Sequence, residues 1–498
     1  MTKENRNTII LMTIITLIAA AMGVLNKSYL VSVMFIAVSW ITGFFMKDKD
    51  IYDVLYGMLL ISLCFDYVLH MPGIENVYMF HIMLAVFTLM SVYKFFTDRD
   101  VWENINKVVL GIFLIWFIYM CITVLWALNR NMAIKYIAIY LMMFAFIVDM
   151  MIYNINKERF ENTVRLALWI ISLTIIVGFV ELLLGHQLPV KHYADAFDNL
   201  SEIHRHMINA RPIAFSFNTN NLAATLAMLS PLCFYAIYKY ENVLVKIFFS
   251  IITIVSFSLI IVTTSRTGMF AYIFGFFVYL IYSVFNIKEN GLKSLMIPIV
   301  LIAGLVVAYN YSGLLVKVEP VNGEKVDSIT LSDKMHDLEE MNFEEGGEGS
   351  INVRGTIIRD VLVTGLIQNK QFLGYGVGNV EQYIRNIGNT GKVFSPHCYP
   401  IEILADFGVP GVVLYGIYYL YLLISNIVLG IKKKNIMCFA AVSGLIAFAP
   451  ACFGPSSITY VFSYWLLMGF AIACIQTCKN DNTSSFNRSR IKEFTFLR

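Results

Sequence analysis

The side chains of this chain that could do chemistry are three arginines and one histidine: Arg211, Arg266, Arg354 and His397. Arginine stays protonated at physiological pH and can donate two parallel hydrogen bonds to a phosphate group. Histidine has an ordinary pKa near neutrality and can take a proton from a hydroxyl group. Residues of these types, if they lie together, suit the transfer of a group from a phosphate-bearing substrate.

Three of these residues also have a simpler interpretation. Arg266 lies in segment 264–268, Thr-Ser-Arg-Thr-Gly, between two apolar runs with almost no loop around it. A guanidinium so close to hydrocarbon is costly unless it is paired or reaches the membrane interface, so Arg266 could be an interfacial anchor. Arg354 could be an ordinary solvated residue, and His397, which follows Pro396, could be an ordinary surface histidine.

Other candidate ligands do not form a recognisable metal site. Residues 186–206 hold His186, His192, His204 and His206, but their spacing suits neither a helical ligand pair nor a finger motif. The eight cysteines show no zinc-type spacing, and seven lie in or beside apolar runs, where a reduced thiol is expected. We therefore predict no metal, no cofactor and no disulfide framework.

The elements that must position the candidate residues are membrane helices. The chain has 498 residues, of which 58% are hydrophobic and 14% charged, and its mean hydropathy is +0.68. A helical span needs about 20 apolar residues, and such runs recur along the whole chain. The net charge of +3 gives no indication of a nucleic-acid partner. The predicted fold is an all-α polytopic membrane protein.

We predict about fourteen transmembrane helices, within a range of about 12–14. The first apolar run follows Lys3 and Arg6 and is long for the apolar part of a signal peptide, so it is interpreted as a span. The predicted spans lie near residues 8–24, 28–46, 51–70, 77–96, 108–127, 132–152, 165–185, 219–238, 244–263, 267–285, 293–312, 409–430, 436–453 and 457–478.

Basic residues test this count independently, because lysine and arginine accumulate in short cytoplasmic loops. With the N-terminus inside, the basic residues of the inside links outnumber those of the short outside links by roughly three to one. We therefore predict a multi-pass protein of the plasma (inner) membrane with both termini cytoplasmic. The same parity places residues 313–402, and any active site they carry, on the extracytoplasmic side.

The chain then divides into four parts. These are an N-terminal bundle of about eleven spans (1–312), a large extracytoplasmic loop (313–408), about three C-terminal spans (409–478) and a basic cytoplasmic tail (479–498). Within the loop, residues 319–349 are strongly acidic and are predicted to be mobile, with no fixed fold.

The second part of the loop, residues 352–408, is predicted to form a helical cap on the membrane face. Apolar residues recur with helical periodicity over 352–369. Three alternating glycines in 373–379 then allow a tight turn with exposed backbone. Further short helices are predicted near 380–386 and 399–406.

Four segments, in this order and on the predicted outer side, resemble motifs of the O-antigen ligase and polymerase superfamily. Arg211 through Ala223 is similar to the family's entry to a span, and Ser265 to Gly268 resembles its Ser-Arg-Thr/Gly-Gly turn. Arg354 through Asn379 resembles its arginine, helix and Leu-Gly-Xaa-Gly-Xaa-Gly-Asn segment. His397 through Gly411 resembles its closing His-Asn…Gly-Xaa-Xaa-Gly segment, with Cys398 in place of the usual asparagine.

This resemblance implies metal-independent transfer from an undecaprenyl-diphosphate-linked oligosaccharide donor to an acceptor of the same kind, in contact with the lipid bilayer. Arg211 and Arg266 would bind the diphosphate, and His397 would act as the catalytic base. Arg354 and Asn379 would make secondary contacts with the substrate. A flippase and a chain-length regulator of the same pathway are candidate partners.

Several functions stay open at this point. A polymerase of repeat units, acting on a capsule or a teichuronic acid-type polymer, is favoured over a ligase that transfers a finished glycan. A lipid-linked oligosaccharide flippase or other transporter would need ionisable residues within the membrane, for which Asp53, Asp66, Asp149 and Glu181 are candidates. A scaffold subunit without chemistry is the third alternative.

Overall fold

The computed structural model describes residues 3–46, 49–65, 68–189, 201–285, 287, 291–320, 326, 329–339, 343–347 and 349–480. The basic tail from residue 481 onward, His192, Asp66 and much of the acidic segment lie outside the described residues.

Each of the fourteen predicted spans coincides with a helix or, for 219–238, with two consecutive helices. The elements are α1 (Lys3–Leu25), α2 (Tyr29–Phe45), α3 (Ile51–Cys64), β1 (His70–Met71), β2 (Ile74–Tyr78), α4 (Met79–Thr97), α5 (Arg99–Asn104), α6 (Lys107–Thr123), α7 (Arg130–Tyr153), α8 (Lys157–Leu184), α9 (Glu202–Asn209), α10 (Thr219–Leu229), α11 (Pro231–Lys239), α12 (Val243–Val262), α13 (Arg266–Phe285), η3 (Gly291–Leu295), α15 (Met296–Tyr311), η4 (Ser312–Leu315), α16 (Leu331–Glu339), α17 (Ser350–Arg359), the π-helical η5 (Asp360–Gln368), α18 (Val380–Ile387), α19 (Tyr399–Lys433), α20 (Ile436–Ala451) and α21 (Phe462–Asn480).

The helices begin at residues that can satisfy free backbone donors. The side chains of Asn106, Asn129, Asn156, Asn218 and Asn435 each accept a hydrogen bond from a backbone N–H in the first turn of the helix that follows. Such caps stabilise a helix start, because the first N–H groups have no partner within the helix. Short polar links therefore suffice to end one span and begin the next.

The fold is an all-α polytopic membrane protein, as predicted. In the described part of the chain, nine helices are long and apolar enough to cross a membrane, and four shorter apolar helices accompany them. Among the residues that the structure describes, the strands form a small antiparallel hairpin of β1 and β2 between α3 and α4.

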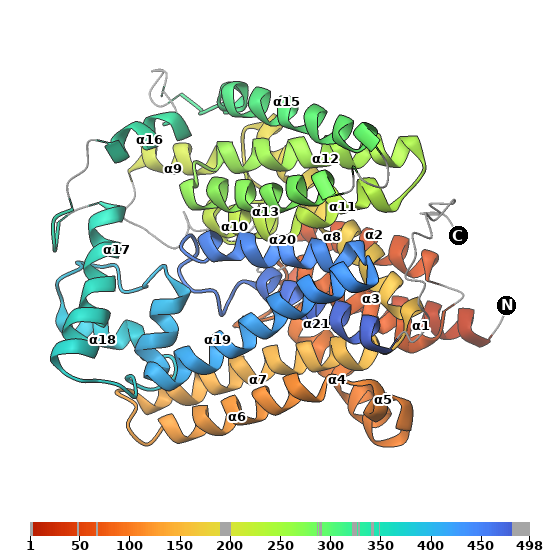
Figure 1. The fold of residues 1–498 in the computed structure, drawn as a ribbon, viewed down its shortest axis with the longest axis horizontal. Helices are drawn as coiled ribbons and strands as arrows, with labels where there is room; N and C mark the ends of the chain where they lie inside the picture. Colours follow the sequence, from red (N-terminus) through yellow and green to blue (C-terminus); the bar gives the residue numbers. More distant parts are fainter. Residues whose placement is uncertain are drawn as a thin grey trace.

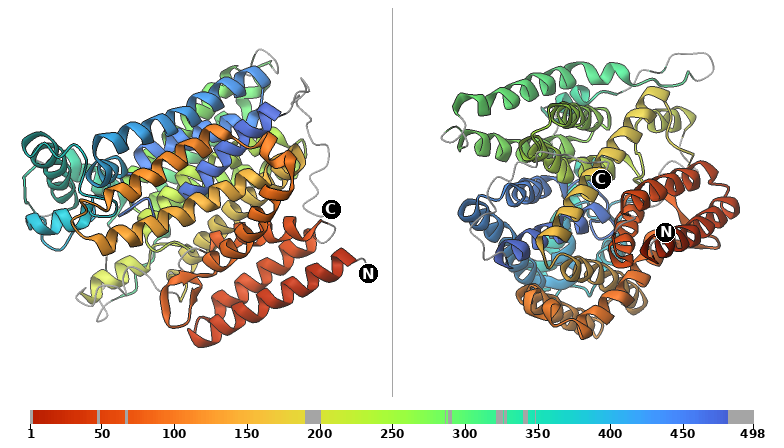
Figure 2. Two further views of the ribbon diagram at one scale, coloured as in Figure 1. Left: turned by 90° about the horizontal axis from the view of Figure 1, so that it is seen from below. Right: turned by 90° about the vertical axis from the view of Figure 1, so that its right-hand side faces the viewer.

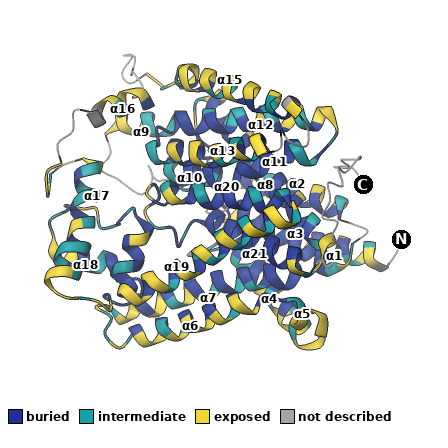
Figure 3. Ribbon diagram, viewed as in Figure 1, coloured by how far each residue is buried: buried dark blue, intermediate teal, exposed yellow. Residues whose placement is uncertain are grey.

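Burial separates central from peripheral helices (Figure 3). In Thr219–Lys239, which comprises α10 and α11, 89% of the apolar window is buried, against 33% in Glu4–Leu25 and 22% in Met296–Leu315. Large apolar side chains of α15, such as Ile299 and Val306, are more than half exposed. A continuous apolar outer face is stable in hydrocarbon rather than in water, so α1 and α15 face lipid and α10–α11 belong to the core.

The two ends of the bundle differ in what they carry. The helices α9, α16, α17 and α18 gather at one end, on the left of Figure 1, and the start of α1 and the end of α21 lie at the other end (Figures 1 and 2). The loop helices and the outer ends of α1 and α21 therefore lie at opposite ends of the bundle.

The acidic part of the loop departs from its prediction. Residues 331–339 form α16, which contacts α13, so the prediction that 319–349 has no fixed fold is wrong for this stretch. Leu331 is 2% exposed and joins the main hydrophobic core, and Met335 packs against that core. These two apolar residues, four positions apart, give α16 an apolar face that the high acidic content conceals.

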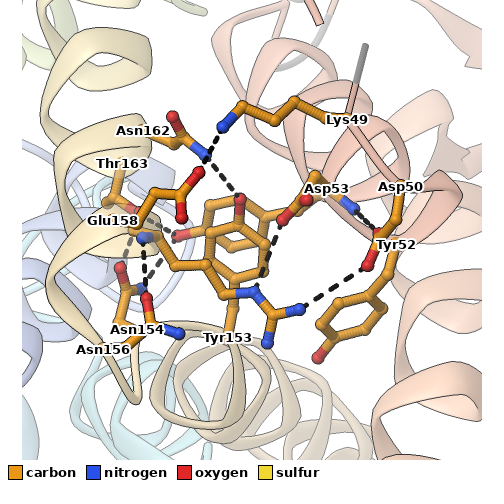
Figure 4. A network of polar contacts seen from close by, with 12 residues as sticks. Lys49, Asp50, Tyr52, Asp53, Tyr153, Asn154, Asn156, Glu158, Asn162 and Thr163 are labelled. Carbon is orange, nitrogen blue, oxygen red and sulfur yellow. Dashed lines mark hydrogen bonds and ion pairs between the residues drawn. The ribbon is translucent and has the colours of Figure 1, made fainter. Parts of the chain in front are cut away.

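The described residues considered for a transporter have structural partners instead. Asp53 lies 3.5 Å from Arg159 in a polar network that joins the start of α3 to the link between α7 and α8 (Figure 4). Asp149 accepts a hydrogen bond of 2.6 Å from Thr88. Glu181 accepts hydrogen bonds from the backbone, as described below. These contacts join helices to one another or to the adjoining links, which is a structural role.

Candidate active site

Arg211 lies between α9 and α10, in a segment that the end of α8 holds in place. Glu181 accepts a hydrogen bond of 2.9 Å from the backbone N–H of Ile213, and Gln187 donates one of 2.8 Å to the backbone carbonyl of Arg211. The guanidinium reaches into the loop, where Nη2 donates to the carbonyl of Ile329 at 3.1 Å. Burial lowers the pKa of Arg211. The side chain is therefore a partly buried cation at the loop end of the bundle.

Arg266 is the first residue of α13, directly after a tight turn from α12. Thr264 in this turn has a φ of 57°, a conformation that a sharp chain reversal requires. A Cβ at Gly268 would lie 2.6 Å from the Cβ of Ala223, so α13 starts in direct contact with α10. Arg266 Nη1 donates to the carbonyl of Lys334 in α16 at 3.0 Å. Arg211 and Arg266 thus both bind the segment 329–334.

Arg354 and His397 both bind the turn between α20 and α21, residues 452–461. Arg354 Nη1 donates to the carbonyl of Phe453 at 3.0 Å. His397 Nδ1 lies 3.1 Å from the carbonyl oxygen of Gly454. Adjacent carbonyl groups of one turn therefore hold side chains that lie 43 positions apart in the loop. No motif in the sequence indicated that these two side chains bind the same turn.

The geometry of His397 fixes which ring nitrogen can act. A carbonyl oxygen only accepts hydrogen bonds, so Nδ1 must carry the proton and Nε2 has the free lone pair in the neutral ring. Burial and the positive charge of Arg354 lower the pKa of His397 to about 4. The imidazole is therefore neutral at pH 7 and able to accept a proton at Nε2. Its backbone φ of 47° shows that the turn itself directs the ring.

Arg266 lies close enough to Arg354 for the two charges to interact. Burial and the charge of Arg266 lower the pKa of Arg354. A Cβ at Gly454 would lie 3.0 Å from Oγ1 of Thr267, so the turn that holds His397 touches the first turn of α13. Arg266, Arg354 and His397 are brought together, and Arg211 joins them through the segment that it shares with Arg266. Like charges so arranged, with part of each side chain buried, favour an anionic ligand.

Asn379 is placed differently. It is 0% exposed, its Oδ1 accepts from the backbone N–H of Asn129 at 2.6 Å, and its Nδ2 donates to the carbonyl of Val377 at 2.9 Å. Because both ends of the side chain are used inside the protein, this placement argues against the predicted secondary contact with substrate. Asn379 joins the loop to the link between α6 and α7.

The glycine-rich segment 373–379 is hydrogen-bonded to α19 and is not an open turn. The carboxylate of Asp406 accepts hydrogen bonds of 2.7–2.9 Å from the backbone N–H groups of Gly378, Asn379 and Val380. The N–H groups of Tyr375 and Gly376 donate to carbonyl groups at the start of α19. The backbone that we expected to be exposed is therefore occupied, and it fixes the loop to α19 a few residues beyond His397.

Cys398, which replaces the asparagine usual in the resembling motif, lies beside His397 and is buried. Burial raises the pKa of its thiol to about 11, so it stays protonated and is not a nucleophile near neutral pH. It packs in the small apolar cluster of the loop that includes Ile357 and Ala405. The substitution therefore keeps a packing role at this position.

The turn 452–461 is the element that we missed in the sequence. Glu402, on α19, is 2% exposed and accepts hydrogen bonds from Ser457 at 2.6 Å and Thr459 at 3.2 Å. It thereby fixes the turn that carries the carbonyl groups bound by Arg354 and His397. The Gly-Pro-Ser-Ser sequence at 454–457, between two apolar runs, was the available signal of a structured turn.

The described residues contain no group of three histidine, cysteine, aspartate or glutamate side chains that could hold a metal ion. His204 and His206 lie on α9, and His206 Nδ1 is 3.3 Å from a carboxylate oxygen of Glu319. This contact accounts for one of the four histidines of 186–206 as a link between α9 and the loop.

The chain is similar to known proteins over most of its length. A family model described as O-antigen ligase matches residues 251–416, which include Arg266, Arg354 and His397. The chain is 22% identical over 459 residues to "Teichuronic acid biosynthesis protein TuaE" of Bacillus subtilis (strain 168), covering 88% of this chain and 87% of that relative. The resemblance to the O-antigen ligase and polymerase superfamily is confirmed, and it supports a multi-pass membrane protein of polysaccharide polymerisation or ligation.

Proposed function

We propose that this chain is a membrane glycosyltransferase that polymerises undecaprenyl-diphosphate-linked oligosaccharide repeat units into a cell-surface polysaccharide. The reaction would take place at the outer face of the plasma membrane. The similarity to a protein of teichuronic acid biosynthesis supports a polymer of this kind, or a capsule, as the product.

The observation that carries the proposal is the arrangement around the turn 452–461. A neutral histidine with a free Nε2 lies beside Arg354, and Arg354 lies within electrostatic reach of Arg266. Transfer from a glycosyl diphosphate requires a base that accepts the hydroxyl proton and positive charge that stabilises the leaving diphosphate, and a histidine next to several arginines can supply both. Arg211 extends the cluster toward the loop segment 329–334.

The step would proceed by displacement at the anomeric carbon of the donor. An acceptor hydroxyl oxygen forms the new bond to that carbon, and the bond from the carbon to the diphosphate oxygen breaks. The electron pair of the broken bond leaves with the lipid diphosphate, whose charge Arg211 and Arg266 stabilise. The hydroxyl proton passes to Nε2 of His397. Arginines supply the positive charge in this scheme, so we expect activity in excess chelator.

The test is polymer formation from purified lipid-linked repeat units with the reconstituted enzyme. His397→Ala should reduce turnover by about 10²–10⁴-fold while donor binding persists, because a general base contributes to that extent. His204→Ala, an exposed histidine on α9, is the matched control and should keep full turnover. Near wild-type turnover of His397→Ala would remove this residue as the base.

Polymerase and ligase are separated by the product left in a deletion strain. Loss of a polymerase leaves single repeat units on the lipid carrier, whereas loss of a ligase leaves long finished chains on it. Accumulation of long lipid-linked chains would assign the site to ligation instead.

A further inference from the structure

The segment 329–339, which contains α16, contacts two arginines of the site through its backbone and the turn before α13 through one side chain. Its carbonyl groups at Ile329 and Lys334 accept from Arg211 Nη2 and Arg266 Nη1 at 3.1 and 3.0 Å. The ammonium of Lys334 donates to Oγ1 of Thr264 at 2.7 Å. A lysine of the acidic part of the loop thus reaches the turn that begins α13.

The packing of α16 against the bundle determines that Lys334 is the residue that reaches the turn before α13. Leu331 is 2% exposed in the main core, and Met335 packs against that core one helical turn later. Asp333 stays exposed and accepts hydrogen bonds of 2.8 Å from the backbone N–H and the hydroxyl of Thr330. The acidic residue therefore caps its own helix, and the docked helix α16 (Figure 1) carries Lys334, whose carbonyl accepts from Arg266 and whose ammonium reaches Thr264.

We propose that Lys334 is a further donor-binding residue, which contacts the diphosphate of the lipid-linked donor together with Arg266. This inference rests on the proposed function. Bringing an ammonium beside a guanidinium is unfavourable by itself, and an anion bound between them reverses the sign of that interaction. A diphosphate carries enough charge and enough oxygen atoms to bind both groups.

The carbonyl contacts are compatible with such a ligand. A guanidinium has five N–H donors, and the carbonyl groups of Ile329 and Lys334 each accept from a single nitrogen of Arg211 and Arg266. These contacts are compatible with a phosphate oxygen as a further acceptor for Arg266. The ammonium of Lys334 adds a compact charge with three rotatable donors, which suits an oxygen that the planar arginine does not reach.

The experiment measures KM and kcat for purified lipid-linked donor, and binding of undecaprenyl diphosphate alone, in reconstituted enzyme. Lys334→Ala should raise KM and the Kd of undecaprenyl diphosphate by about 10-fold, since one charge-assisted hydrogen bond is lost. Lys334→Arg should restore both constants. Lys317→Ala, which removes an exposed lysine at the start of the same loop, is the matched control and should leave both unchanged.

Lys334→Gln separates a binding role from a tether. Glutamine can still donate to Thr264 but has no charge, so it should be as weak as Lys334→Ala if the ammonium binds diphosphate. Wild-type constants for Lys334→Gln or Lys334→Ala would overturn the inference. If Arg266→Ala abolishes undecaprenyl diphosphate binding while the lysine variants do not, the proposed function stands and this inference fails. If neither residue affects binding, the proposed diphosphate site itself is wrong.

Discussion

At the scale of single residues, the environment of His397 has a direct consequence for the pH dependence. The pKa of His397 is lowered to about 4 by burial and by the charge of Arg354. A base acts in its neutral form, so activity should be lost only as the pH falls through that value. Above about pH 5, kcat/KM should not vary with histidine ionisation.

Removing the charge of Arg354 should shift the pH at which activity is lost in acid. In Arg354→Gln, the pKa of His397 should rise above about 4 but stay below its ordinary value of about 6.5, because burial, the larger cause, remains, so the decline of kcat/KM in acid should begin at a higher pH than in the wild type. Glutamine can still donate to the carbonyl of Phe453, which keeps the local backbone contact. The measurement is the pH profile of kcat/KM between about pH 4.5 and 8 for both proteins. Identical profiles would show that the arginine does not act on His397.

Arg266 allows a second test at this scale, between a site residue and an interfacial anchor. Arg266→Lys should be nearly as inactive as Arg266→Ala, because an ammonium cannot reproduce the paired hydrogen bonds of a guanidinium to phosphate. An anchor would tolerate lysine well. Arg99→Lys on α5 is the control, since Arg99 pairs with Glu103 at an exposed surface. Polymer formation by the Arg266→Lys enzyme at the control rate would favour the anchor.

The sequence predicted the residue types of the site but not their contacts. Arg354 and His397 are identified by the resembling motifs, whereas their common support, the turn after α20, comes from a part of the chain that we divided between two spans. A hydrogen bond to a backbone carbonyl leaves no trace in the identity of the accepting residue. Asn379 likewise matched a motif, although its side-chain oxygen and nitrogen both form hydrogen bonds to backbone groups inside the protein, which the motif does not reveal.

At the scale of elements, α19 depends on a kink at Gly408. This residue has φ 65° and ψ −161° inside the helix, and its N-terminal side carries Asp406, which binds the glycine-rich segment. A Cβ at Gly408 would lie 2.1 Å from the carbonyl oxygen of Phe372. The kink therefore directs the first turns of α19 across the loop and leaves the remainder to span the membrane.

Gly408→Ala should accordingly destabilise the protein by about 2–4 kcal/mol, from backbone strain and overpacking. Gly416→Ala, two turns later in the same helix, has nothing within 4 Å of the added Cβ and should be neutral or slightly stabilising. Thermal unfolding of the two purified variants in detergent checks the difference. Equal melting temperatures would mean that the kink can be relieved without cost.

Most elements could be predicted because their signals are local. Apolar runs and capping asparagines define the spans, and the helices of 352–406 follow from periodicity and from turn residues. The helix α16 was missed because its fold depends on burying Leu331 and Met335 against distant helices, while the segment around it is acidic. A local composition rule cannot register that tertiary contact.

At the scale of the whole molecule, the candidate site lies at one end of the helical bundle. The loop helices α17 and α18 lie at one end of the bundle, and α5, the start of α1 and the end of α21 lie at the other (Figure 1). Basic residues are concentrated in the links assigned to the second end, which predicts that this end is cytoplasmic. The donor would then be available to the arginines from the outer leaflet.

Cysteine labelling of intact cells tests this orientation. Cys121 is exposed and the other seven cysteines are buried, so a Cys121→Ser background leaves little intrinsic labelling. Lys392→Cys, at an exposed position of the loop, should react with a membrane-impermeant maleimide from outside. Glu103→Cys, at an exposed position of α5, should react only after the cells are permeabilised. The reverse pattern would place the arginines and His397 in the cytoplasm, where a polymerase acting on externally displayed repeat units could not meet its substrate.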